Sequence, residues 1–168
     1  AFGDKFFLYQ FWGWKNSEAA RAHLWAMLSV HDGTTWAAGG PANKQALIDL
    51  GWDEKTEFIP YWRKDTGIAV ESSVQPVVAS GWTHGEKRLL VMVLNDSDIT
   101  ASCKLKVDFA RFGFTGTTVK YRDYGYGGLA YPEESFKEKP PQEMSVAKGN
   151  DIVFETGRHS YKLLLFYE

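Results

Sequence analysis

An alternation of apolar and polar residues with a period of two begins near residue 57 and continues to the end of the chain. This period places successive side chains on opposite faces of a strand, so that one face of each strand is buried. The pattern predicts eight strands, at 57–62, 68–75, 77–83, 87–95, 100–109, 117–122, 151–156 and 160–167. Short strands separated by turn residues at this spacing are typical of an antiparallel β-sandwich, which is the fold we expect.

Turn residues connect several of these predicted strands. His84-Gly85-Glu86 is expected to form a hairpin, and residues 95–98 (NDSD) a turn. Between residues 125 and 145, the pair Gly127-Gly128 and the prolines at 132, 140 and 141 interrupt any regular element. We therefore expect a long surface loop in this segment.

The first third of the chain has a different pattern. Residues 5–12 (KFFLYQFW) are almost continuously apolar and aromatic, which predicts a strand covered on both faces, as in a parallel sheet. A helix is predicted at about 18–30, because Asn16 and Ser17 offer an N-cap and apolar residues follow at helical spacing. A second short helix is expected to begin at Pro41 and to end before Gly51.

A lone strand and helix cannot bury both faces of the strand without a sheet beside it. We therefore expect residues 1–55 to be the end of a (β/α)8 barrel and residues 56–168 to be a C-terminal β-sandwich. The fold class is α+β, mainly β. Because the sequence begins with Ala1 rather than Met and shows no signal peptide, we expect it to be a piece of a longer protein.

Charge and hydropathy exclude several kinds of partner. The net charge is −2 and no cluster of Lys and Arg is present, so that nucleic acid is not expected as a partner. The longest apolar run has six residues, 89–94, whereas a membrane-spanning helix needs about 20. The four His residues have no metal-ligand spacing, and the single Cys103 is expected to be a small buried side chain. We predict no metal and no cofactor.

Aromatic residues make up 15% of the sequence, including seven Trp and eight Tyr. Their rings fill cores, but they also form flat platforms on which sugar rings stack. The candidate saccharide contacts are Trp12, Trp14, Trp36, Tyr124 and Tyr126. The alternative for each is structural: packing of a strand end for Trp12 and Trp14, a loop anchor for Trp36, and a polar rim of the sandwich for the two tyrosines.

Other side chains are expected to be structural. The strand pattern predicts that Trp62, Trp82, Phe109 and Phe112 belong to the core. His31 and Asp32 are interpreted as a pair at a helix end, with a ligand role as the alternative.

Three segments, 24–32 (LWAMLSVHD), 50–62 (LGWDEKTEFIPYW) and 88–114 (RLLVMVLNDSDITASCKLKVDFARFGF), together resemble the end of the barrel and the C-terminal β-domain of large glycoside hydrolases. The resemblance is particularly to family-123-like and related uncharacterised hydrolases. The segment 160–167 (SYKLLLFY) also resembles the last strand of many glycosidase C-terminal sandwiches. The resemblance implies that the catalytic carboxylates lie on earlier strands of a preceding catalytic domain. It also implies a structural or ancillary role for this chain.

Catalysis by this chain alone is not predicted. A glycosidase usually needs two carboxyl groups roughly 5–10 Å apart, and the sequence indicates no such pair. Asp96 and Asp98 share a turn, which Asp favours for local reasons. We therefore expect an accessory domain of a secreted or periplasmic carbohydrate-active enzyme. The alternatives are a free-standing carbohydrate-binding module and a structural or assembly sandwich that binds no saccharide.

Overall fold

The computed structural model describes residues 18–33, 41–128 and 140–168. Within these residues the chain forms two antiparallel sheets packed as a sandwich, with two short helices that precede it. The fold class predicted from the sequence is thus confirmed. The predicted strand at 5–12 and the proposed N-cap at Asn16 and Ser17 lie outside the described residues.

The larger sheet has the strand order β1-β3-β4-β9-β6-β7, and the smaller sheet has the order β2-β5-β8. The strands of the larger sheet are β1 (Glu57–Ile59), β3 (Val77–Thr83), β4 (Arg88–Asn95), β6 (Thr118–Gly128), β7 (Gln142–Ala147) and β9 (Ser160–Tyr167). The strands of the smaller sheet are β2 (Ile68–Ser72), β5 (Ala101–Val107) and β8 (Ile152–Thr156). A short 3-10 helix, Phe109–Phe112, follows β5.

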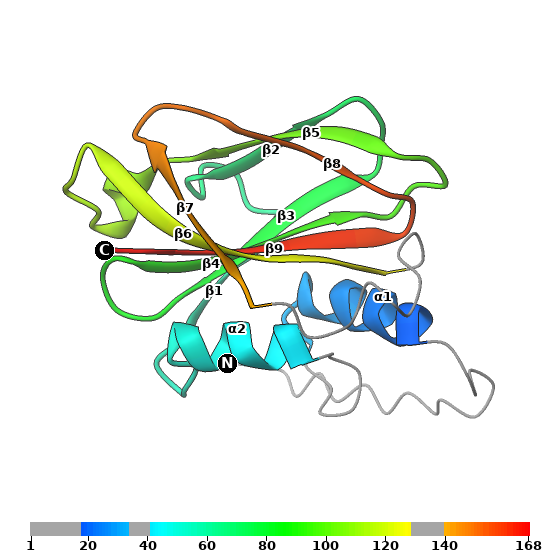
Figure 1. The fold of residues 1–168 in the computed structure, drawn as a ribbon, viewed down its shortest axis with the longest axis horizontal. Coiled ribbons are helices and arrows are strands. Elements are labelled where there is room, and N and C mark those ends of the chain that lie inside the picture. The colour runs from blue at the N-terminus through cyan, green and yellow to red at the C-terminus, as the bar shows by residue number, and fades with distance from the viewer. Residues whose placement is uncertain (1–17, 34–40, 129–139) are drawn as a thin grey trace.

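The molecule has three layers, with the larger sheet in the middle (Figure 1). The smaller sheet covers one face of the larger sheet, and the helices α1 (Glu18–Ser29) and α2 (Pro41–Leu50) cover the other. As predicted, Gly51 follows α2 with a φ of 83°, a conformation that glycine adopts without a steric penalty. Neither described helix is long and apolar enough to cross a membrane.

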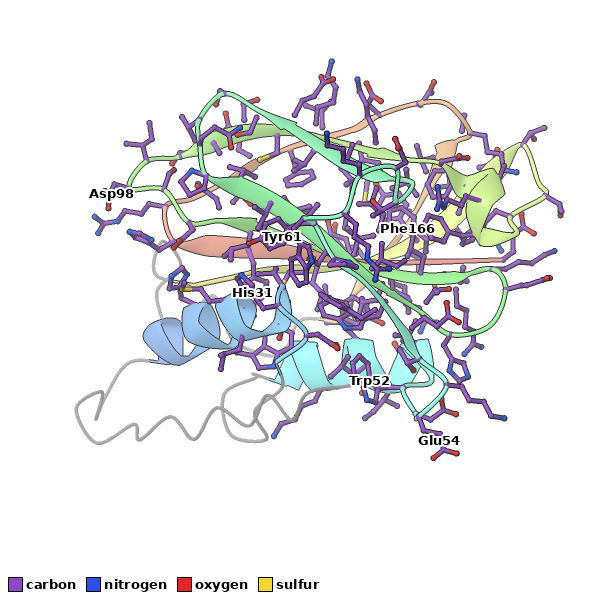
Figure 2. The ribbon with its side chains drawn as sticks, turned by 180° about the vertical axis from the view of Figure 1, so that it is seen from behind. His31, Trp52, Glu54, Tyr61, Asp98 and Phe166 are labelled. Carbon is purple, nitrogen blue, oxygen red and sulfur yellow. The ribbon has the colours of Figure 1, made fainter. Side chains whose placement is uncertain are left out.

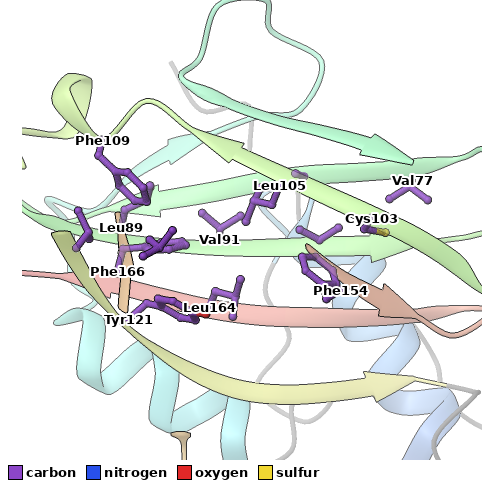
Figure 3. Close-up of a cluster of buried hydrophobic side chains, with 14 of the residues drawn as sticks. Val77, Leu89, Val91, Cys103, Leu105, Phe109, Tyr121, Phe154, Leu164 and Phe166 are labelled. Atoms are coloured by element: carbon purple, nitrogen blue, oxygen red, sulfur yellow. The ribbon is translucent and has the colours of Figure 1, made fainter. Parts of the chain in front are cut away.

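The inner core fills the space between the two sheets (Figure 3). Alternate residues of β4, Leu89, Val91 and Val93, meet Leu105 of β5 and Phe166 of β9 there. Phe166 is fully buried, with its ring 5.1 Å from that of Phe109 and 5.5 Å from that of Tyr121. Cys103 is buried in the same core, as predicted.

The outer core lies between the larger sheet and the helices. The residues of β4 and β9 that point away from the inner core supply its sheet side, and α1 and α2 supply the rest. Its buried members are Trp25, Ala26, Val30, Ala46, Leu50, Trp82, Leu90, Met92, Leu94, Tyr161, Leu163 and Leu165. Because β4 and β9 are covered on both faces, they are almost continuously buried rather than alternating.

Two sequence predictions about the strands are wrong. The segment 125–145 was expected to lack regular elements, but β6 continues to Gly128 and β7 begins at Gln142. Val146 is the one buried side chain of β7. The strand therefore has almost no alternation of apolar and polar residues, which explains why the sequence pattern missed it. The strand expected at 57–62 ends at Ile59, because Pro60 has no N–H to continue the ladder.

Neighbouring strands in the sequence do not all pair. The predicted hairpin at 84–86 is present, since β3 and β4 are antiparallel partners. The turn at 95–98 instead passes from the larger sheet to β5 in the smaller sheet. Asn95 holds this turn beside the turn between β8 and β9, because its Nδ2 donates to the carbonyls of Ile99, Thr156 and Gly157.

Candidate functional site

Within the described residues, the most exposed group of aromatic side chains lies where α1 and β1 end. Tyr61 and Trp62 follow Pro60 and turn outward, and both are exposed, Trp62 to 51%. The ring of Trp62 is stacked on that of His31, with centroids 5.8 Å apart and an angle of 21° between the planes. Tyr61 meets both rings edge-on. We call His31, Tyr61 and Trp62 the aromatic patch.

The aromatic patch is held in place from beneath. Phe58 packs between Trp62, at 5.8 Å, and the buried Trp82, at 5.6 Å. The backbone N–H of Tyr61 donates to Ser80 Oγ, which itself donates to the carbonyl of Val30 at the end of α1. The patch therefore rests on the outer core and is not a flexible loop tip.

His31 is fixed by both of its ring nitrogens. Its Nδ1 lies 2.7 Å from the carbonyl oxygen of Met27 and donates to it. In the neutral ring, Nε2 is then an acceptor for the hydroxyl of Tyr61, 3.0 Å away. Figure 2 shows His31 and Tyr61 side by side, with Trp52 farther along the molecule near α2.

A cleft of about 810 Å³ begins at the aromatic patch. Tyr61 belongs to its lining, which continues along β2 and β3 to the turn at 149–151. Hydrogen-bonding side chains of both charges line it, including Arg63, Asp65, Asp108 and Asp151. Tyr61 thus connects the aromatic patch to a groove lined by both polar and apolar side chains.

The core prediction for the aromatic residues is correct except at one position. Trp82 and Phe109 are buried, and Phe112 packs partly buried against the inner core. Trp62 is the exception, because the strand ends before it and its side chain leaves the sheet. The proline at position 60 is the sequence signal that could have placed Trp62 on the surface.

Of the five predicted saccharide contacts, the structure describes the side chain of Tyr124 alone. Trp12, Trp14 and Trp36 lie outside the described residues. Tyr126 lies in β6, where its backbone pairs with Lys162, but its side chain is also outside the description. Tyr124 is half-buried, and its hydroxyl donates to Asp49 of α2, which fits the structural alternative for this residue.

Asp49 joins α2 to β6 of the larger sheet. Its Oδ2 accepts from Tyr124 and, at 2.9 Å, from Nη1 of Arg122, and its Oδ1 accepts from Gln45 at 2.7 Å. Burial alone would raise the pKa of Asp49, but these three hydrogen bonds lower it overall. Burial and the neighbouring Asp49 carboxylate both raise the pKa of Tyr124. These groups form a structural ion pair between the helical layer and the sheet.

A second polar group contains two of the four histidines. His23 of α1 and His159 of the turn between β8 and β9 both face Asp96, and Asp98 contacts His159. We call His23, Asp96 and His159 the histidine cluster. Burial lowers the pKa of His23, whose side chain is almost fully enclosed. The sequence spacing gave no indication of this cluster, because its members come from three distant segments.

No carboxylate pair in the described residues is assigned to acid/base catalysis. Asp96 and Asp98 lie in the turn after β4, where Ser97 donates to Asn95 from both its backbone N–H and its hydroxyl. Both aspartates use their carboxylates to contact His159. The turn that the sequence indicated is present, but its local side-chain hydrogen bonds go to Asn95 and not to the two aspartates.

Comparisons with protein-family models, with curated proteins and with solved structures find no match for this chain.

Proposed function

We propose that this chain is the accessory β-sandwich of a carbohydrate-active enzyme and that it contacts saccharide through the aromatic patch. The observation that carries the proposal is the stacked pair of His31 and the exposed Trp62, next to Tyr61, which lines the cleft. The resemblance of several segments to C-terminal domains of glycoside hydrolases agrees with this function.

The chemistry of the aromatic patch suits a sugar ring. One face of a pyranose presents C–H groups, which pack well on the π face of an indole. The hydroxyl groups at the ring edge need hydrogen-bond partners, and the carboxylates and cations of the cleft can supply them. The contacts with His31 and Phe58 hold the Trp62 ring before binding, which lowers the entropic cost of binding.

An accessory role also agrees with the exposed apolar side chains on the helical side. Ile48 of α2 is 69% exposed, and Trp52 follows the same helix with part of its ring in solvent. Such side chains fit packing against a preceding catalytic domain of the same protein. In this proposal the catalytic carboxylates belong to that domain, and the chain alone does not hydrolyse a glycosidic bond.

The test is a fluorescence titration of the chain with a panel of soluble oligosaccharides and polysaccharides. We expect saturable binding of one glycan class and a loss of at least about tenfold in affinity for Trp62→Ala, or ~1.4 kcal/mol. Trp52→Ala is the matched control, because it removes another exposed indole that packs on Trp82 rather than on the aromatic patch. The Trp52→Ala variant should bind the glycan with the affinity of the wild type.

A flat response over the whole panel would reject saccharide binding and favour the purely structural alternative. Equal losses for Trp62→Ala and Trp52→Ala would show that the patch is not the contact surface. Tyr61→Phe sharpens the test, since it keeps the ring and removes the hydroxyl that His31 accepts from.

A further inference from the structure

The histidine cluster brings together metal-ligating side chains from three parts of the chain. His23 comes from α1, Asp96 from the turn after β4, and His159 from the turn before β9. One ligand atom from each residue lies within 4.8 Å of the other two. Figure 2 shows Asp98, which follows in the same turn as Asp96, at the end of the sandwich and away from His31 and Tyr61.

Two distances in the cluster match those around a tetrahedral ion, and the third, between the two histidine nitrogens, is within 4.8 Å. His23 Nε2 and His159 Nδ1 each lie 3.3 Å from Asp96 Oδ1. Zinc binds His nitrogen and carboxylate oxygen at about 2.0–2.1 Å, so that neighbouring ligand atoms of a tetrahedron are about 3.3 Å apart.

From this geometry we propose that His23, Asp96 and His159 bind a divalent transition-metal ion, with zinc as the best fit. Two imidazoles and one carboxylate form a donor set that zinc uses in proteins, with a water molecule as the fourth ligand. Asp96 is 35% and His159 26% exposed, so that a hydrated ion can reach the cluster from solvent.

Asp98 supplies the outer hydrogen bond that metal-binding histidines usually have. Its Oδ1 lies 2.9 Å from His159 Nε2, which donates to it. The neutral ring then carries its proton on Nε2 and presents the lone pair of Nδ1 toward Asp96 and the proposed ion. The carboxylate of Asp98 thus fixes the tautomer that zinc binding requires.

The backbone around the cluster is fixed before an ion binds. Asn95 holds the two turns together through its three donated hydrogen bonds, and the N–H of His159 donates to the carbonyl of Ser97 at 3.2 Å. The N–H of Asp96 donates to the carbonyl of Pro76. Binding therefore needs little rearrangement of the sandwich, and the ion fastens α1 to it.

Isothermal titration calorimetry of the chelator-treated chain with zinc chloride tests the proposal. We expect one ion per chain, and the visible absorption of tetrahedral cobalt when Co²⁺ replaces zinc. Asp96→Asn and His159→Gln should each weaken zinc binding by roughly a hundredfold, and Asp98→Asn by about tenfold, since an outer partner is worth roughly 10–100-fold in affinity.

His84→Gln is the matched control. His84 Nδ1 lies 3.2 Å from Asp53 Oδ1. The control therefore also removes a histidine from a His–Asp contact, but this contact is not part of the histidine cluster. It should bind zinc as the wild type does. Absence of zinc binding by the wild-type chain, or an equal loss in His84→Gln, would overturn the proposal.

A measurement on the wild-type chain covers the case in which a variant fails to fold. Zinc should shift the imidazole NMR resonances of His23 and His159 and leave those of His31 and His84 in place. Shifts spread over all four histidines would indicate weak surface binding and reject the cluster as the site.

Discussion

The two faces of the larger sheet are buried in different ways. The inner face meets another sheet, and its core consists of apolar side chains that alternate along β4, β5 and β9. The outer face meets two helices, and its core includes Trp25, Trp82 and Tyr161. Polar contacts at the edges of this outer layer involve Asp49, Arg88, Ser80 and His23.

This difference shows how each layer is positioned. Two sheets pack through complementary pleated surfaces, so that burial alone specifies their arrangement. A short helix on a sheet can slide or rotate, and directional contacts restrict it. Arg88 illustrates this at the end of α2, where its Nη1 lies 3.5 Å from the carbonyls of Asp49 and Leu50. Both candidate sites use this same boundary between the helices and the sandwich.

Truncation in the inner core should have the largest effect on stability. Phe166 is fully buried among Phe109, Tyr121 and Leu89. We expect Phe166→Ala to lower the free energy of unfolding by about 4 kcal/mol, because neighbouring strands cannot move in to fill the cavity. Urea denaturation followed by circular dichroism measures this.

Val153→Ala is the control for that variant. Val153 lies on β8 with its side chain exposed, and its truncation should change stability by less than about 0.5 kcal/mol. Similar losses for the two variants would contradict the assignment of the inner core as the main source of stability.

A truncation on the opposite face of the same strand should cost less. Leu163 of β9 is buried against the helical layer. We expect Leu163→Ala to cost about 3 kcal/mol, since α1 and α2 can partly close the cavity. Hydrogen exchange should also become faster in α1 and α2 than in β5 and β8. Uniform acceleration in all three layers would show that the two faces of the larger sheet unfold as one unit.

The same contrast explains how much of the fold the sequence predicted. Strands β3, β4, β8 and β9 were placed within a residue of their ends. A period-two pattern marks β8, whereas a continuous apolar run bounded by turn residues marks β4 and β9. Helix α2 was found from Pro41 and Gly51, whose backbone preferences are local. Strand β7 was missed, since Val146 is its one buried side chain and an edge strand needs little else.

The candidate sites were less predictable, because they depend on distant segments. The aromatic patch requires His31 to meet Trp62, and the histidine cluster requires α1 to meet two turns of the sandwich. Neither contact follows from spacing along the chain. Of the predicted saccharide contacts, Tyr124 has its hydrogen-bond partner Asp49 in α2, far away in the sequence, so that local sequence could not indicate this contact.

The smallest effect is expected from the polar attachment of α2. Asp49→Asn removes the charge that accepts hydrogen bonds from Arg122 and Tyr124, and we expect a loss of about 1–2 kcal/mol at neutral pH. Glu143→Gln is the matched control, because Glu143 contacts the same guanidinium at 3.2 Å but is largely exposed. Its loss should be below about 0.5 kcal/mol.

The pH dependence of the stability difference between the wild type and Asp49→Asn shows whether the charge of Asp49 causes it. The pKa of Asp49 is lowered in the folded chain, so that folding favours its charged form. Its contribution to stability should be fully present above the pKa of an unfolded Asp, about 3.9, and should decline as the pH falls below that value. The stabilities of the wild type and Asp49→Asn, measured by urea denaturation, should therefore converge at low pH. A constant difference down to the acid limit would mean that Asp49 attaches α2 through its shape and not through its charge.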